Sequence, residues 1–423
     1  MESWQLDAIP VYTGGTLLQT LYTCGSGLTP DENGMTGTDT QMHIIQGTDE
    51  TAFRAYCGKL ESDGFSRTFT RDEPHGLYRQ YRKSGLLVYA YYIPGTRTAR
   101  VLLDRDSCAL PDFACGTEKE KHMDTQLMQF GLLYDDMIRW TSCDCGMNYV
   151  LRLRDGRLIV IDGGEREQAT QTAIGEFMKR IRAMTGTNEG DPVRVALWYC
   201  SHPHDDHMDF FVKLLQKFGD TIRLERVMFN FASDSVLGLE SYVQDMRRTV
   251  LRHNPDVLFL KPHTGQRFSI GNARFDVLFT HEDLLALESE TPEYDGTNTT
   301  STILKISFED VSFLLLADAD DTVGNVLCAR YPNGLDCTFL QTAHHLINRV
   351  ERTYQHVRAE YILIPEGRYL IHKNMRRNYK MLCRYYDRDN FFLAGDYSCV
   401  FHICGKETEE KYYPVRGCLY DGT

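Results

Sequence analysis

The segment SHPHDDHMDFF, residues 201–211, limits what this chain can be more than any other part of it. It places His202, His204, Asp206 and His207 within six residues, directly after an apolar stretch that reads as a buried strand. Imidazole nitrogens and carboxylate oxygens are ligands of zinc and related divalent metals. The His-x-His pair points both rings the same way from an extended segment, and Asp206 and His207 follow as the chain turns. The segment therefore predicts a site for two metal ions about 3.5–4 Å apart.

The composition of the 423 residues is that of an ordinary globular chain, with 42% hydrophobic and 25% charged residues. The formal charge of −13 argues against a general nucleic-acid binder, which needs a concentrated basic face. No apolar run reaches about 18 residues, and the N-terminus lacks a basic segment followed by an apolar one, so we expect no membrane contact. The 13 cysteines are scattered and odd in number, which favours free thiols in a reducing cytoplasm.

The pattern along the chain predicts two domains. Residues 105–129 mix proline, glycine and charge without apolar periodicity, which indicates a linker. It separates a first domain, residues 1–104, from a second domain, residues 130–405, and residues 406–423 are expected to be a C-terminal tail. Strand and helix patterns alternate in the second domain, with two antiparallel stretches, which predicts a layered α/β sandwich.

The first domain is expected to have an α+β fold. One apolar stripe at helical spacing predicts a helix, and the tyrosine-rich segments that follow it predict antiparallel strands. The stripe consists of Phe53, Tyr56, Cys57 and Leu60. We expect this domain to supply a pocket wall or a contact between copies of the chain, and an independent binding module is the alternative. The aromatic candidates for that role are Tyr78, Tyr81, Tyr89 and Tyr91.

Three further apolar stretches in the second domain end in residues that suit a metal site. LIVIDGG carries Asp162, FLLLADADD carries Asp318, and FLQTAHHLIN carries the pair His344 and His345. With the histidine cluster, these motifs resemble those of the metallo-β-lactamase superfamily. The resemblance implies an αββα sandwich, here preceded by the α+β domain. It also implies that Asp162 orients the metal loop and that Asp318 bridges the two metals.

One branch of that superfamily resembles this chain most. The segments GQRFSIGNARFDVLFTHED and GTNTTSTILKISFEDVSFLLLAD are similar to the metallo-hydrolase domain of the bacterial DNA-uptake channel family, ComEC. The likeness spans about residues 130–403 and suggests a bacterial protein.

The resemblance also implies a set of ligands and catalytic groups. The expected metal ligands are His202, His204, Asp206, His207, His281, Asp318 and His344. Of these, His281 is the first choice for the third histidine of the first metal, with His253 and His263 as alternatives. Asp206 is expected to shuttle a proton, and His345 and His372 to assist a leaving group or an oxyanion.

The function implied by this set is hydrolysis by a hydroxide that bridges two divalent ions. Zinc is the expected metal, with manganese or iron as alternatives. The expected substrate is a small molecule carrying a phosphoester or phosphodiester. The alternatives are a lactone, a thioester or a β-lactam, or a non-catalytic regulatory protein that keeps the metal. A flavo-diiron oxidoreductase is disfavoured, because it would carry Glu at the position of His204.

Overall fold

The computed structural model describes most of the chain. The described ranges are 8–23, 28–29, 36–37, 40–111, 123–131, 146–231, 240–286, 297–395, 398–404 and 407–413. Residues 112–122 of the predicted linker lie outside these ranges. No helix of the described part is long and apolar enough to cross a membrane.

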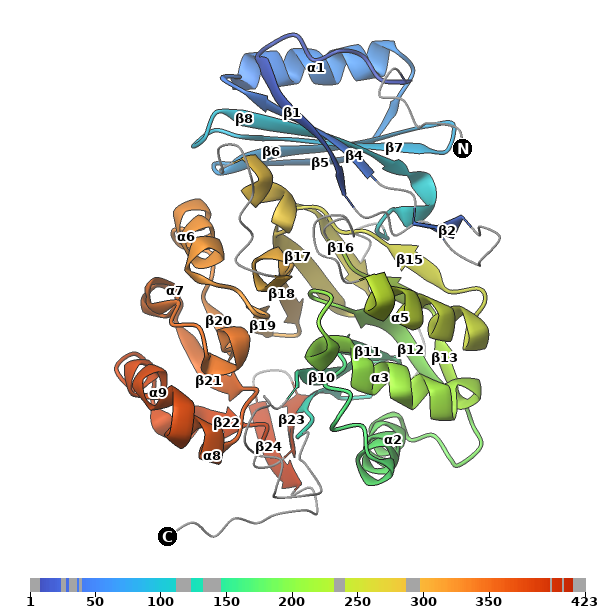
Figure 1. The fold of residues 1–423 in the computed structure, drawn as a ribbon, viewed down its shortest axis with the longest axis vertical. Helices are drawn as coiled ribbons and strands as arrows, with labels where there is room; N and C mark the ends of the chain where they lie inside the picture. The colour runs from blue at the N-terminus through green and yellow to red at the C-terminus, as the bar shows by residue number, and fades with distance from the viewer. Residues whose placement is uncertain are drawn as a thin grey trace.

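The first domain is a six-stranded antiparallel sheet with one helix on its outer face (Figure 1). The strand order is β1-β4-β8-β7-β6-β5. The strands are β1 (Thr16–Thr23), β4 (Thr40–Gln46), β5 (Ser66–Glu73), β6 (Gly76–Lys83), β7 (Leu86–Ile93) and β8 (Thr98–Arg105). Two short strands, β2 (Leu28–Thr29) and β3 (Thr36–Gly37), pair separately.

Two features of the sequence explain why helix α1 (Glu50–Ser62) forms and where it begins. Asp49 caps its N-terminus by accepting a hydrogen bond of 2.8 Å from the backbone N–H of Ala52. The predicted stripe is buried against the sheet, with Phe53 and Leu60 fully covered. The expected helix-on-sheet core is therefore present.

The other face of this sheet packs on the second domain. Tyr89 donates a hydrogen bond of 2.9 Å to the carbonyl of Thr264, and Tyr91 donates one of 3.2 Å to Oδ1 of Asp283. Gly265, at φ +88°, lies flat against the ring of Tyr78, where a Cβ would come within 2.1 Å of Cε1. These three tyrosines are fully buried at the domain junction, and Tyr81 is buried on the α1 side instead. Three of the four candidate tyrosines therefore pack between the two domains. The expectation that the first domain supplies a pocket wall or a contact between copies of the chain stays a prediction.

The second domain is a sandwich of two mixed sheets. The first sheet contains β9 (Thr125–Gln129), β10 (Asn148–Arg152), β11 (Leu158–Asp162), β12 (Val193–Tyr199), β13 (Ile222–Leu224), β14 (Arg226–Met228), β15 (Leu258–Leu260), β23 (Ser398–Cys404) and β24 (Glu407–Tyr413). The second contains β16 (Arg267–Ile270), β17 (Ala273–Phe279), β18 (Ile303–Phe308), β19 (Val311–Leu315), β20 (Cys337–Gln341), β21 (Ala359–Ile364) and β22 (Phe391–Leu393). The inner faces meet in one apolar core, in which Tyr149 of β10 packs edge-on against Phe313 of β19 at 5.3 Å. Strand β9 lies within the predicted linker and β24 within the predicted tail, so both segments contribute to the sheet.

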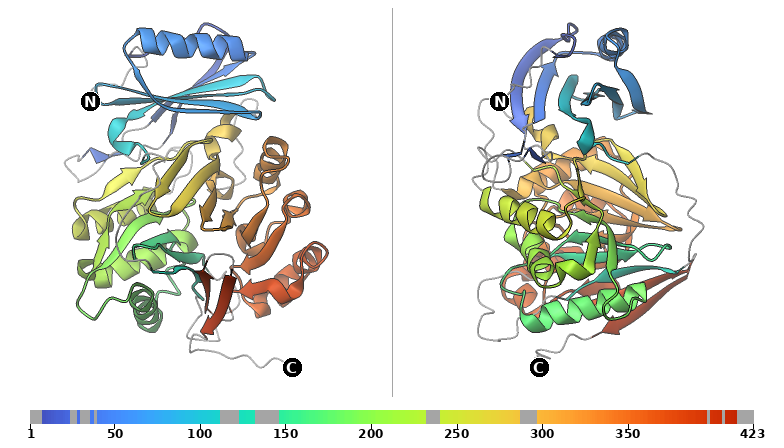
Figure 2. Two further views of the ribbon diagram at one scale, coloured as in Figure 1. Left: turned by 180° about the vertical axis from the view of Figure 1, so that it is seen from behind. Right: turned by 90° about the vertical axis from the view of Figure 1, so that its right-hand side faces the viewer.

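Helices cover the outer face of each sheet, which completes the four layers (Figure 1, Figure 2). Helices α2 (Gln171–Thr185), α3 (Asp205–Phe218) and α5 (Glu240–His253) lie on the first sheet. Helices α6 (Asp321–Arg330), α7 (Glu351–His356) and α9 (Arg376–Leu382) lie on the second. The architecture is the αββα sandwich expected from the sequence, with the α+β domain stacked on one end.

Candidate metal centre

The predicted ligands meet where strands of both sheets end. His202 and His204 follow β12, Asp318 follows β19, and the pair His344 and His345 follows β20. The carboxyl ends of parallel strands meet at one edge of a sheet, and ligands of α/β proteins bind there. Stacking the two sheets brings both edges to one place, so residues more than 100 positions apart form a single cluster.

Asp162, at the end of β11, holds the metal loop in place. Its Oδ1 accepts a hydrogen bond of 2.7 Å from the backbone N–H of Ser201, and its Oδ2 accepts one of 2.9 Å from the hydroxyl of Ser201. Oδ2 also accepts a bond of 2.8 Å from Nδ1 of His207. Asp162 has φ +52°, an uncommon conformation outside glycine. It therefore orients the loop and the ring of His207 and belongs to neither metal-capable group, as the resemblance implied.

Asp318 stands at the centre of the cluster, with 1% of its surface exposed. Its Oδ2 lies 3.7 Å from Nε2 of His202 and 3.6 Å from Nε2 of His344. Its Oδ1 lies 3.2 Å from Nε2 of His207 and 3.9 Å from Nε2 of His345. Each oxygen of one carboxylate thus faces a separate set of histidines.

Two overlapping groups of side chains could each hold a metal ion, with ligand atoms within 4.8 Å of one another. The first group is His202, His204 and Asp318. The second group is Asp206, His207, Asp318 and His345. Asp318 belongs to both, which is the arrangement of a bridging ligand.

The histidine pair is grouped differently from the sequence prediction. His345 takes the place expected for His344, with Nε2 3.0 Å from Oδ2 of Asp206. His344 faces the Oδ2 side of Asp318 instead, next to the first group. His344, His345 and Leu346 all have positive φ, so the chain reverses sharply here and aims adjacent rings at different oxygens. Sequence spacing does not reveal such a turn.

The other histidine candidates lie outside both groups. His281 begins η5 (His281–Ala286), fully buried beside Glu282 and Lys261, and burial lowers its pKa to about 4. His263 lies between Asp104 and Glu282. His253 pairs with Asp220 at 3.0 Å. His372 is exposed on the π-helical turn Ile371–Met375.

The side chains of the cluster shift one another's pKa values strongly. Burial, and then the neighbouring His207, hold the pKa of His202 well below its ordinary value. Burial would also lower the pKa of His207, but the carboxylates of Asp318, Asp206 and Asp162 raise it well above the ordinary value. The pKa of Asp318 lies well below its usual range, because His207 and His202 outweigh the effect of burial. The net effect is a buried, ionised carboxylate with histidines around it.

The donor set fits divalent cations. Oδ1 of Asp318, Nε2 of His207 and Nδ1 of His344 are buried and have no hydrogen-bond partner in the part of the chain that the structure describes. Buried polar atoms without partners are costly unless a ligand or ion completes them. Nitrogen and carboxylate oxygen donors in groups of three and four suit zinc and other first-row metals.

Comparisons with known proteins give matches among solved structures. No protein-family model matches the chain, and no curated protein does. Among solved structures, the chain is similar to CmlA, a diiron β-hydroxylase from Streptomyces venezuelae, at 13% identity and a TM-score of 0.30, over 69% of this chain and 58% of that one. It is similar to a metallo-β-lactamase from Cronobacter sakazakii at 15% identity and a TM-score of 0.28, over 59% and 86%. It is also similar to human tRNase Z, short form, at 14% identity and a TM-score of 0.29, over 64% and 96%. The chain therefore spans less than two thirds of CmlA.

Proposed function

We propose that this protein is a hydrolase that uses two divalent cations. The observation that carries the proposal is the position of Asp318, whose two carboxylate oxygens face two different sets of histidines. In a mononuclear site a carboxylate binds one ion, so histidine donors are expected beside only one of its oxygens. In a two-metal site, where the ions lie about 3.5–4 Å apart, one carboxylate can bind both of them.

The residues divide into two ligand sets that share Asp318. His202, His204 and His344 would hold one cation, and Asp206, His207 and His345 the other. When bound, the two cations would supply Lewis acidity and lower the pKa of a bound water toward neutrality.

Hydrogen bonds outside the cluster select the ring nitrogen that each ligand presents. His207 donates from Nδ1 to Asp162 at 2.8 Å, and His345 donates from Nδ1 to the carbonyl of Pro365 at 2.9 Å. Both bonds leave Nε2 facing the carboxylates of the cluster. Partners of this kind fix the ring and increase its basicity toward a metal. The rings of His207 and His345 are therefore already oriented for metal binding by their hydrogen bonds to the protein.

The accessible side of the centre is formed by its less buried members. His344 and Asp206 expose 20% and 19% of their side chains, whereas His202 and His207 expose none. Nδ2 of Asn298 lies at the same side, 3.3 Å from Nε2 of His344. A substrate that enters there meets the carboxylate of Asp206 and the amide of Asn298.

We propose zinc as the metal and a phosphoester or phosphodiester as the substrate class. The mixed histidine and carboxylate set supports zinc. The phosphoester is supported by the ComEC-like sequence segments around Asn298 and Asp318.

The test combines metal analysis with a substrate panel. The purified chain, loaded with Zn²⁺, Mn²⁺ or Fe²⁺, is offered bis(p-nitrophenyl) phosphate, p-nitrophenyl phosphate, a lactone, a thioester and a chromogenic β-lactam. We expect two metal ions per chain and turnover of a phosphate ester. Asp318→Ala should lose both, whereas Asp310→Ala, an exposed aspartate before the same strand β19, should lose neither. Turnover of another ester class would refute the substrate, and two bound ions without any turnover would favour a regulatory role.

A further inference from the structure

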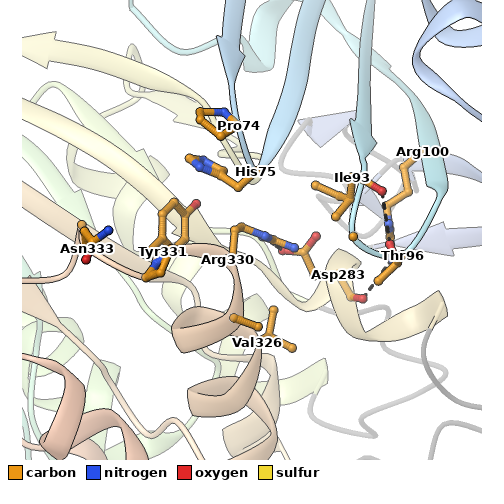
Figure 3. A pocket seen from close by; sticks show the side chains of 14 residues that line it. Pro74, His75, Ile93, Thr96, Arg100, Asp283, Val326, Arg330, Tyr331 and Asn333 are labelled. Atoms are coloured by element: carbon orange, nitrogen blue, oxygen red, sulfur yellow. Dashed lines mark hydrogen bonds and ion pairs between the residues drawn. The ribbon is translucent and has the colours of Figure 1, made fainter.

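A cavity of about 570 Å³ lies at the junction of the two domains, apart from the metal centre (Figure 3). The first domain contributes two hairpin turns, 74–75 between β5 and β6 and 93–96 between β7 and β8. The second domain contributes the C-terminal part of α6 and residues 331–334 that follow it. No member of either metal-capable group lines the cavity. Its volume falls in the range of about 300–1,000 Å³ typical of small-molecule sites.

Most of the cavity wall is apolar. Ile93 and Val326 face it from opposite domains, and Pro74 and Tyr331 border it on the other side (Figure 3). The ring of His75 packs edge-on against Tyr331, with 4.6 Å between centroids. Burial, followed by the charge of nearby Arg71, lowers the pKa of His75 to about 4. At neutral pH this imidazole is therefore uncharged and belongs to the apolar wall.

A buried positive charge borders the same cavity. Arg100 is 3% exposed, and its guanidinium donates to the carbonyls of Glu282 and Asp283 at 2.9 and 3.0 Å. Its third bond goes to the hydroxyl of Thr98 at 3.1 Å. None of these acceptors is a carboxylate, and Arg100 forms no ion pair within the described residues. A buried charge without a counter-ion is costly.

The nearby carboxylate does not neutralise Arg100, because another arginine uses it. Oδ2 of Asp283 lies 2.7 Å from Nη1 of Arg330. Arg330 meets Asp283 through Nη1 alone and not through the two-pronged pair that a guanidinium can form with a carboxylate. Two arginines therefore border the cavity with one carboxylate between them, which leaves one positive charge in excess (Figure 3).

We propose that this cavity binds an organic anion with an apolar body, namely a carboxylate or sulfonate carried on an aromatic or alkyl group. The apolar wall accepts the body, and the excess charge of Arg100 and Arg330 attracts the anionic group. The site is independent of the metal centre and goes beyond the proposed hydrolase activity.

The experiment uses two fluorescent probes that differ in one charge. 1-Anilinonaphthalene-8-sulfonate carries the anionic group, and N-phenyl-1-naphthylamine has the same body without it. We expect the full-length protein to bind one molecule of the sulfonate per chain, about tenfold or more tighter than the neutral probe. Binding should be the same before and after treatment with a chelator, because no member of either metal-capable group lines the cavity.

Two pairs of variants locate the bound probe. Ala329→Trp places a large ring in the cavity from an exposed position of α6 and should weaken the sulfonate about tenfold or more. Asn325→Trp, at another exposed position of α6 that lies outside the cavity lining, should leave binding unchanged. Arg100→Gln should weaken the sulfonate and not the neutral probe, and Arg100→Lys should retain most of the affinity.

Several results would overturn the proposal. Unchanged sulfonate binding in Ala329→Trp would move the probe elsewhere, and loss of binding on chelation would move it to the metal centre. Equal affinity for both probes would show that the cavity does not recognise the anionic group. If Arg100→Gln does not fold, two measurements still test the proposal. They are the relative affinity of the two probes for the unaltered protein and the sulfonate affinity of the two tryptophan variants.

Discussion

Nε2 of His263 lies 2.7 Å from Oδ2 of Asp104, which joins the two domains through a buried ion pair. Nδ1 of the same ring lies 2.9 Å from Oε1 of Glu282, so one histidine sits between two carboxylates. All three side chains are buried. Burial alone would lower the pKa of His263, but Glu282 and Asp104 raise it to about 9. The junction is therefore held by an imidazolium at neutral pH.

This pair predicts how stability changes with pH. The folded-state pKa of His263, about 9, lies above its ordinary value of 6.5, so its contribution is complete below pH 6.5 and is lost as the pH rises through 9. Burial would raise the pKa of Glu282, but His263 lowers it to about 2 from 4.5, so its contribution is lost as the pH falls below 4.5 toward 2. Calorimetry should show the melting temperature falling between pH 7 and 9. His263→Gln should melt lower at pH 7 and lose much of this pH dependence, and a parallel decline in both proteins would contradict the assignment.

The adjacent histidines after β20 should affect different metal ions. Each of His344→Ala and His345→Ala should reduce the metal content from two ions per chain to about one. His281→Ala is the matched control, since it removes a buried histidine that lies outside both groups, and should leave the content at two. Inductively coupled plasma mass spectrometry of the desalted proteins measures the number of metal ions per chain directly. A loss of metal in His281→Ala would restore that residue as a ligand.

Asp162 should act through its effect on His207. Asp162→Asn keeps the size of the side chain but removes the charge that accepts from Nδ1 of His207. Changes to such outer partners typically lower metal affinity about 10- to 100-fold. Titration with a competing zinc chelator should show this loss of affinity, while the circular dichroism spectrum of Asp162→Asn stays unchanged. The control variant Asp310→Asn should bind zinc as tightly as the unaltered protein. Equal zinc affinity in Asp162→Asn would show that the loop is fixed without this charge.

The sequence could predict features that depend on local pattern. The spacing of Phe53 and Leu60 predicts α1 and its buried face, and His-x-His after an apolar strand predicts the first ligands. The resemblance to a known superfamily adds the expectation that Asp318 bridges two metals, which stays a prediction. Each of these depends on a motif of a few neighbouring residues or on the end of an apolar strand.

Features that depend on long-range packing could not be predicted. His281 ends an apolar strand just as Asp318 does, yet β17 delivers it beside Glu282 and Lys261. The roles of His344 and His345 depend on consecutive positive φ angles, which no residue type there requires. Alternation in β7 shows that Tyr89 and Tyr91 share a face, but it does not show that this face is covered by the second domain. The partners lie about 175–192 positions away in the chain.

The last prediction concerns separation of the domains. The sequence suggests that residues 1–104 are not needed to build the metal centre, because every expected ligand lies between His202 and His344. The structure adds that removing them uncovers the carbonyl of Thr264 and leaves His263 without Asp104. A protein of residues 123–423 should therefore melt well below the full chain or aggregate, even where it still binds metal. The control is the full chain with Tyr89→Phe, which loses one hydrogen bond of about 1 kcal/mol and should stay monodisperse. Light scattering and calorimetry compare the three proteins. A shortened protein with the melting temperature of the full chain would show that the first domain is a separable module.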